Sequence, residues 1–588
     1  MPADDPGRLA VDPSVRRWFV AALICAMPLA VARADPALDA RIAVIVASPS
    51  VEQAGNASAL RDPAWLAQVY PPWNSGPVWF TAAGPRPSVA VALREMRAAA
   101  DRGLRAGDYD VATLERRVDA AALANPAHDA VARADVALTT AVLRFISDAR
   151  FGRVRPGDVA PMYRAQPKDA WFVAGLRDAV ATDRLVATID SSEPALPVFG
   201  RLKSLMARYR TLATQPSATL PALEPRRTKV VEGESYAGVA ALYDKLVRLG
   251  DLPAGTPGPV DDRYSYDLAA AVRGFQSRQG LEPDGVLGKQ TIAALNEPLE
   301  TRVTQIELAL ERMRWLPELP PGPAIAINIP SFQLWAFADA TDTRSATLSM
   351  PVIVGRAVRH ETPVFIGEMR AVEFSPYWNV PPNILRNELL PRLVRDPGFL
   401  QREDMELVST RRDGTVRTTV DDESLAALRA GELRLRQRPG PKNALGGVKF
   451  VLPNTMDIYL HDTPSQGLFA RARRDFSHGC IRVNDPAGLA EFVLRGRPEW
   501  TPEAIGAAMA SGQNQSVRLA GPVPVIVFYT TAIVDSGGRA LFLADVYGHD
   551  RRLLEALRKV GSDTTFRGER RVHSAPLPES GVRYHFPG

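Results

Sequence analysis

The sequence predicts a multidomain protein of the α+β class, and three observations lead to this prediction. Its 588 residues exceed the usual size of a single domain. Apolar residues recur at helical spacing through residues 35–297, whereas from Pro323 onward they fall in short β-rich runs. A charged stretch at residues 383–437 interrupts these runs. We therefore expect helical domains first, followed by a mostly antiparallel β domain with a helical insertion.

Composition places the chain among ordinary globular proteins. Apolar residues make up 46% of the sequence and charged residues 23%. The net charge of +5 is slight for this length, and no basic stripe with interleaved aromatic residues is present. We therefore expect no nucleic-acid partner.

Residues 1–34 have the pattern of a signal peptide. Arg16 and Arg17 precede an apolar run at residues 18–30, and Ala32-Arg33-Ala34 offers a small-residue cleavage site. The apolar run is short for a membrane span, so cleavage after Ala34 is favoured over the alternative of a short anchor. No later run is long and apolar enough to span a membrane. The mature chain is thus expected to be exported, without a membrane span.

Residues 35–220 are expected to form a helical domain. Apolar residues at 89–96 and 136–149 have helical spacing. The aromatic residues that we expect to pack between these helices are Trp65, Tyr70, Trp73, Trp79 and Phe80. Three prolines within residues 215–227 then indicate a linker.

The sequence pattern of residues 230–297 predicts a smaller helical domain. Leu268, Val272 and Phe275 lie on one helical face, and Gly280 is placed to end that helix. A turn at residues 283–285 precedes a second helix at 289–295. A linking helix follows within residues 301–320.

The β domain is expected to cover residues 323–525. Strands are predicted at residues 324–329, 332–337, 350–355, 362–366, 449–452, 457–461 and 523–531. Helices of a dozen residues do not separate the early strands, which favours antiparallel pairing. Asp485 and Pro486 begin a helix as N-cap and first-turn residue. Residues 526–588 form a closing segment, with a strand at 541–547 and a helix at 551–557.

The candidate site is built around Cys480. The other cysteine, Cys25, lies in the predicted signal peptide, so the mature chain would carry one thiol. His478 and Gly479 precede it, and His461 ends a nearby apolar run. An imidazole can generate the thiolate nucleophile, and a glycine lets backbone amides approach a developing oxyanion. The alternative is an inert buried cysteine.

These residues resemble the signature of a known family. His461-Asp462, followed about fifteen residues later by Ser477-His478-Gly479-Cys480-Ile481-Arg482, resembles the L,D-transpeptidase (YkuD) catalytic domain. The pattern at residues 271–296 looks like a three-helix peptidoglycan-binding domain. The helical region at 35–220 resembles the scaffold domain of large Gram-negative members, and residues 383–437 resemble their capping subdomain. Residues 311–317 resemble the run between the binding and catalytic domains of these members, which implies that Trp315 lies at the interface of the two domains. The resemblance implies a β-sandwich for the catalytic domain.

The resemblance also implies roles for the site residues. Cys480 would be the nucleophile and His461 its base. A backbone carbonyl near the site would orient the ring, so the carboxylate of Asp462 need not be essential. The amides of Gly479, Cys480 and His478 would bind the oxyanion, and Ser477 would shape the loop. The residues expected to contact substrate are Arg482, through a stem carboxylate, and Tyr459 and Trp378, along the donor groove.

The implied substrate is peptidoglycan in the periplasm. A tetrapeptide donor stem ending in D-Ala would be joined to the diaminopimelate of an acceptor stem, without cofactor or metal, and carbapenems would inhibit. Three alternatives stay open. The same residues could hydrolyse stems as an L,D-carboxypeptidase or endopeptidase, His461, His478 and Cys480 could bind a metal in a hydrolase, or the chain could be a non-catalytic wall-binding protein.

Overall fold

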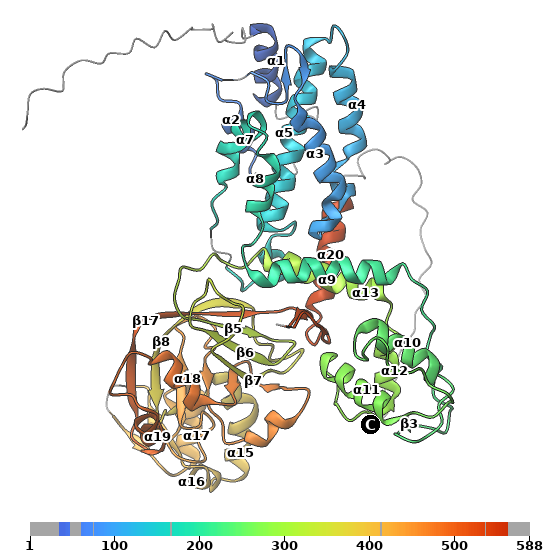
Figure 1. Cartoon of the computed structure of the whole chain (residues 1–588). Coiled ribbons are helices and arrows are strands. Elements are labelled where there is room, and N and C mark those ends of the chain that lie inside the picture. The colour runs from blue at the N-terminus through green and yellow to red at the C-terminus, as the bar shows by residue number, and fades with distance from the viewer. Residues whose placement is uncertain are drawn as a thin grey trace, which may run out of the picture.

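The computed structural model describes residues 35–47, 60–74, 76–164, 167–411, 414–535 and 537–562. The predicted signal peptide and most of the last thirty residues lie outside these ranges. Figure 1 shows a helical bundle, a small helical domain and a β domain, with two long helices, α9 and α13, running between them. None of the helices in the described ranges is long and apolar enough to cross a membrane.

The N-terminal bundle contains the two helices expected from its apolar spacing, which lie within α3 and α5. Its elements are α1 (Pro36–Ala47), α2 (Ala64–Val69), β1 (Phe80–Thr81), β2 (Gly84–Pro85), α3 (Pro87–Arg97), η2 (Ala98–Arg102), η3 (Ala106–Tyr109), α4 (Val111–Ala121), α5 (His128–Phe151), α6 (Pro156–Val159), α7 (Trp171–Ala181), α8 (Leu185–Ser192) and α9 (Pro197–Ala213). Four of the five predicted core aromatic residues are buried. Trp73 is 87% exposed, so that prediction is wrong. It follows Pro71 and Pro72 in a turn after α2.

The second domain agrees closely with its sequence pattern. It comprises β3 (Lys229–Val230), α10 (Val239–Leu249), α11 (Tyr266–Arg278), β4 (Leu287–Gly288) and α12 (Lys289–Leu295). Leu268, Val272 and Phe275 are buried together. Gly280 follows α11 with φ of +65°, a conformation that favours glycine. Gln276 is buried in α11 and bonds both the Asp284 side chain and the Gly285 amide, which fixes the following turn.

Helix α13 (Leu299–Met313) connects the domains. It packs along α9 and contacts the C-terminal helix α20 (His549–Ser562), and Arg312 bonds Asp550 at 2.5 Å. The carbonyl of Trp315 accepts a bond from Tyr163 of the bundle at 2.6 Å, while its side chain lies in the core cluster of the β domain. Trp315 is therefore an interface residue, but it lies between the bundle and the β domain rather than between the small helical domain and the β domain as predicted.

The β domain is built on a nine-stranded sheet that closes on itself. Its strands are β5 (Ala324–Asn328), β6 (Gln333–Phe337), β7 (Leu348–Gly355), β8 (Phe365–Phe374), β13 (Val448–Val451), β14 (Leu460–His461), β15 (Asp475–Ser477), β16 (Ile481–Val483) and β17 (Gln515–Phe528). The order is β15-β7-β16-β14-β13-β8-β17-β5-β6, and β6 also pairs with β7. Three pairs, β14–β16, β17–β5 and β15–β7, are parallel and the others antiparallel.

The structure corrects the expectation of a β-sandwich, because the domain contains one closed sheet instead of two packed sheets. Strand β7 has hydrogen-bonded neighbours on both sides, which joins the two ends of the sheet. Helices α18 (Pro486–Val493) and α19 (Pro502–Ala510) follow β16. Asp485 caps α18 by accepting a bond from the Gly488 amide at 2.9 Å, as the sequence predicted.

The insertion is not purely helical, which corrects a second prediction. Strands β9 (Trp378–Asn379), β10 (Met405–Ser409), β11 (Val416–Arg417) and β12 (Leu433–Gln437) form a separate four-stranded antiparallel sheet. The helices are α14 (Pro382–Ile384), π-helix η4 (Leu385–Leu389), α15 (Leu390–Arg395), α16 (Phe399–Arg402) and α17 (Asp422–Ala430). Leu433 and Leu435 alternate with arginines along β12, a strand period that the charged composition concealed.

The closing segment also differs from the prediction in part. The expected helix at 551–557 lies within α20. The expected strand at 541–547 is reduced to β19 (Ala540–Phe542), which pairs with β18 (Ala532–Val534) as a separate hairpin outside the main sheet. A short 3-10 helix, η5 (Gln466–Ala470), precedes β15.

Candidate functional site

A row of polar residues crosses the closed sheet at the predicted site. Lys449 on β13 pairs with Glu373 on β8 and with His461 on β14, and His461 pairs with Arg482 on β16. Paired residues point to the same face of a sheet, and their neighbours along each strand point to the other. Leu460, beside His461, is fully buried in the core. The row therefore places His461 between two cationic side chains.

His461 is buried, with 4% of its surface exposed. Its Nδ1 lies 2.5 Å from the backbone carbonyl oxygen of Asp462. Since a carbonyl only accepts, Nδ1 carries the proton and Nε2 is left as the proton acceptor. Burial, followed by the positive charges of Arg482 and Lys449, lowers the pKa of His461 to about 3. The imidazole is therefore neutral and has the tautomer of a general base.

The Asp462 carboxylate bonds the surrounding backbone. One oxygen accepts from the Gly447 amide at 2.8 Å and the other from the Thr463 amide at 2.6 Å. The ring of His461 is held by the main-chain carbonyl of the same residue. Asp462 thus supports the site in two ways, of which only the carbonyl touches the imidazole.

Cys480 stands directly before β16, two residues before Arg482, and its thiol accepts a hydrogen bond from the Tyr459 side chain, whose ring also contacts His461. Its Sγ donates to the backbone carbonyl of Asp457 at 3.5 Å. Burial raises the pKa of the Cys480 thiol, partly offset by hydrogen bonds from the backbone and side chain of Tyr459. Across the described residues, no hydrogen bond joins this thiol to His461. The resting site therefore holds a neutral thiol that must turn towards the imidazole to react.

Tyr459 lies against the side chains of both Cys480 and His461. Its ring centroid is 5.7 Å from that of His461, and the Lys449 Nζ lies 4.5 Å from the same Tyr459 ring. Burial, and then the Cys480 charge, raise the pKa of Tyr459 well above its ordinary value. Its hydroxyl stays protonated and can donate to a thiolate or to an oxyanion beside it.

Ser477 closes the loop at residues 477–480, which carries the proposed nucleophile Cys480 and is called the nucleophile loop. Its hydroxyl donates to the Cys480 carbonyl at 2.5 Å and accepts from the Gly479 amide at 3.1 Å. Gly479 has φ of +120°, and its carbonyl accepts from Thr362 at 2.7 Å. The Gly479 amide is thus directed into the turn, which corrects its expected role as an oxyanion donor. Among the described residues, no hydrogen-bond acceptor lies opposite the Cys480 amide.

His478 connects the nucleophile loop to the insertion. Its Nε2 lies 2.6 Å from the Glu388 Oε1 on η4, and its ring centroid is 4.7 Å from that of His360. Sequence reasoning missed both partners. Glu388 stands 90 residues from His478 within a charged stretch, and no local pattern distinguishes it from its neighbours.

The two remaining predicted contact residues, Arg482 and Trp378, differ in their packing and hydrogen-bond partners. Among the described side chains, the buried Nε of Arg482 is one of the few nitrogens without a hydrogen-bond partner, so it can bind a carboxylate. Trp378 instead pairs with Gln437 in the insertion and packs on that subdomain's core. The structure therefore brings Arg482 and Tyr459 to the thiol but gives Trp378 a packing role.

The metal-ligand alternative finds no support in the geometry. Within the described ranges, no three His, Cys, Asp or Glu side chains lie together in a way that could hold a metal ion. His461, His478 and Cys480 accordingly do not form a ligand set.

Three parts of the chain match models of known domain families. The family model of the L,D-transpeptidase catalytic domain, YkuD, matches residues 322–502. Residues 64–206 match a Scaffold domain, and residues 235–295 match the "Putative peptidoglycan binding domain" model.

Two individual proteins are also similar to parts of the chain. A Haemophilus influenzae protein named "Putative L,D-transpeptidase" is 32% identical over 280 residues, which cover 47% of this chain and 55% of that relative. The chain thus matches about half the length of this curated relative. The crystal structure of an L,D-transpeptidase (Yku) from Stackebrandtia nassauensis aligns with 51% of this chain and 95% of its own, at 13% identity and a TM-score of 0.22. From the family models, the chain contains a YkuD L,D-transpeptidase catalytic domain, together with a Scaffold domain and a peptidoglycan-binding domain.

Proposed function

We propose that this protein is an L,D-transpeptidase that cross-links peptidoglycan stem peptides through a thioester on Cys480. The observation that carries the proposal is the Cys480 thiol beside Tyr459, whose ring contacts a neutral histidine held by a main-chain carbonyl, inside a YkuD domain. An imidazole with a free Nε2 beside a thiol is the arrangement that acyl transfer requires.

The first half-reaction is acylation. The Cys480 thiol gives its proton to the His461 Nε2 as the sulfur attacks the carbonyl carbon that precedes the terminal D-Ala of a donor stem. The Cys480 amide and the Tyr459 hydroxyl are placed to stabilise the tetrahedral oxyanion. The C–N bond then breaks, and the amine of D-Ala leaves with the proton from His461. A thioester remains on the enzyme.

The second half-reaction is transfer. The side-chain amine of an acceptor stem attacks the thioester carbon while His461 accepts an amine proton. The C–S bond breaks, the proton returns to sulfur, and an amide cross-link joins the two stems. Arg482 is suited to hold a stem carboxylate during either step, because its buried guanidinium has an unused donor. Water as acceptor would give a carboxypeptidase instead.

The other domains support the same substrate. A peptidoglycan-binding domain and a long linking helix adjoin the catalytic domain, so the polymer can be held near the nucleophile. We place this activity in the periplasm because residues 1–34 have the pattern of a cleaved export signal. N-terminal sequencing of exported protein beginning at Asp35 would support this placement.

The test is intact-protein mass spectrometry of mature protein with a purified disaccharide tetrapeptide, with and without meropenem. We expect a carbapenem adduct on Cys480 and, without inhibitor, a cross-linked dimer. Tripeptide alone would assign hydrolysis, and neither adduct nor product from folded protein would contradict the proposal.

A variant of His461 and a variant of its neighbour Asp462 form a matched pair for this test. His461→Gln removes the base and is expected to reduce product formation at least about 100-fold. Asp462→Asn leaves the main-chain carbonyl in place and is expected to retain most activity. A similar loss in both variants would contradict the assignment of the carbonyl as the group that orients the ring.

A further inference from the structure

The outward face of the closed sheet is hollow beside the linking helix. On β5, Ile325 and Ile327 point into the core, so Ala324 and Ala326 point outward. Their outward neighbours across the sheet are large: Ala326 pairs with Trp335 on β6 and with Ile526 on β17. Small side chains between large ones leave a trough along β5.

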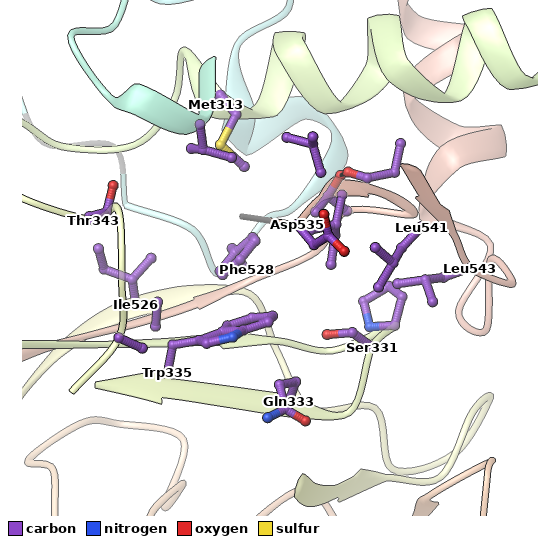
Figure 2. Close-up of a pocket in the computed structure, with 18 of the residues that line it drawn as sticks. Met313, Ser331, Gln333, Trp335, Thr343, Ile526, Phe528, Asp535, Leu541 and Leu543 are labelled. Carbon is purple, nitrogen blue, oxygen red and sulfur yellow. Dashed lines mark hydrogen bonds between the residues drawn. The ribbon is translucent and has the colours of Figure 1, made fainter. Parts of the chain in front are cut away.

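The trough forms the floor of a cavity of about 1170 Å³. Figure 2 shows Trp335, Ile526 and Phe528 on the sheet side, with Met313 from the end of α13 across the space. Leu541 and Leu543 of the C-terminal hairpin line a further side. A cavity of this size with aromatic and aliphatic walls and a few polar groups has the character of a ligand site.

The wall of the cavity joins the peptidoglycan-binding domain to the nucleophile loop. Residues 280–283, in the turn after α11, line one side, and residues 470–474, before β15, line another. Arg474 is fixed against the β5–β6 turn by donating to the Phe332 carbonyl at 3.2 Å. It stands six residues before Cys480, a chain length that spans at most about 20 Å. A polymer in the cavity can therefore also reach the catalytic thiol.

The charges around the cavity favour an acidic ligand. Three of its four carboxylates are already paired: Glu193 with Lys203, Glu318 with Arg150 and Asp535 with Arg539.

Two of the lining cations are less completely satisfied. Lys168 donates to the Arg314 carbonyl rather than to a carboxylate, and burial lowers its pKa to about 8. Within the described ranges, the buried Nε of Arg201 and Oγ1 of Thr343 have no hydrogen-bond partner. The cavity thus offers apolar rings together with positive charge that carboxylates do not fully offset.

We propose that this cavity is a second peptidoglycan-binding site, which holds sugar rings over Trp335 and an acidic stem peptide against Lys168 and Arg201. The inference rests on the proposed function, since it assigns the same polymer to a new place. The polymer is favoured because the cavity continues from the peptidoglycan-binding domain and because stem peptides carry carboxylates. Strands held there would present neighbouring stems to Cys480.

The experiment measures co-sedimentation of the full mature chain with purified sacculi, in a Cys480→Ala background that prevents turnover. Ala326→Trp fills the trough and Trp335→Ala removes its aromatic wall, while Trp73→Ala changes an exposed tryptophan far from the cavity. We expect the first two variants to weaken binding about tenfold and the control to bind as the parent does. Unchanged binding in Ala326→Trp would overturn the inference.

A second readout separates this inference from the proposed function and from misfolding. In the Cys480-containing chain, Ala326→Trp should keep the parental rate of acylation by meropenem and of turnover of the soluble disaccharide tetrapeptide. A parent that binds sacculi through the cavity but is never acylated would reject the function alone. Dodecyl phosphate is the competing probe: if it binds the parent and not Ala326→Trp, while sacculi bind both equally, the site is a lipid site and the inference is wrong.

Discussion

The resting site is predicted to contain a neutral thiol and a neutral imidazole rather than an ion pair. The pKa of Cys480 lies above its ordinary value of 9.0, and that of His461 is about 3. At pH 7 an imidazole with a pKa of about 3 is protonated in only about one molecule in 10⁴, and the raised pKa of the Cys480 thiol keeps that group protonated as well.

Two measurements check this prediction. The mature chain would contain one cysteine, so thiolate absorbance at 240 nm, taken against Cys480→Ser, reports Cys480 alone. We expect no thiolate signal at pH 7 and its appearance only above about pH 9. Because the pKa of His461 is lowered, its base form persists as pH falls through 6.5. Acylation by meropenem should therefore show no inflection near pH 6.5.

A variant extends the same reasoning, and one result would refute it. Arg482→Gln removes the largest charge that lowers the His461 pKa, so its acid limb should move to higher pH. A thiolate signal at pH 7 that disappears in His461→Gln would show a stable ion pair and contradict the neutral site.

Three further predictions concern other parts of the molecule. Glu388→Gln removes the charged partner of His478 at an exposed contact. We expect the free energy of unfolding to change by less than about 1 kcal/mol but the rate of acylation to change several-fold. An unchanged acylation rate would show that this contact does not affect the site. Gln276→Leu leaves buried partners in the peptidoglycan-binding domain unsatisfied and should destabilise it by about 3 kcal/mol in urea unfolding, with Ser277→Leu at an exposed position of the same helix as the control. Burial lowers the pKa of His549 to about 3, so below pH 6.5 the unfolded chain takes up a proton that the native chain does not. The melting temperature should therefore fall as pH drops from 6.5 towards 3, and His549→Phe should reduce that fall.

The local pattern of the sequence was sufficient wherever neighbouring residues decide the outcome. Residues 289–295 form the predicted helix at the predicted bounds, and Asp485 caps α18, because both depend on contacts within a few positions. The spacing of His461 and Cys480 likewise indicated the catalytic chemistry. The insertion was misassigned as helical because charged residues alternate with leucines in β12, and alternation over only five positions is a weak signal.

The tertiary structure decided everything that depends on which strands pair. Only the register of β8, β13, β14 and β16 places Lys449 and Arg482 beside His461 and so sets its protonation, and only the pairing of β6 with β7 closes the sheet. The sequence by itself determined the order of the domains and singled out Cys480 and His461, the proposed nucleophile and base, because these are written in residue type and spacing. It did not determine the Glu388 contact, the direction of the Gly479 amide or the cavity over Ala326. Each of these arises from segments that are far apart in the chain or from a backbone angle, which a one-dimensional pattern does not specify.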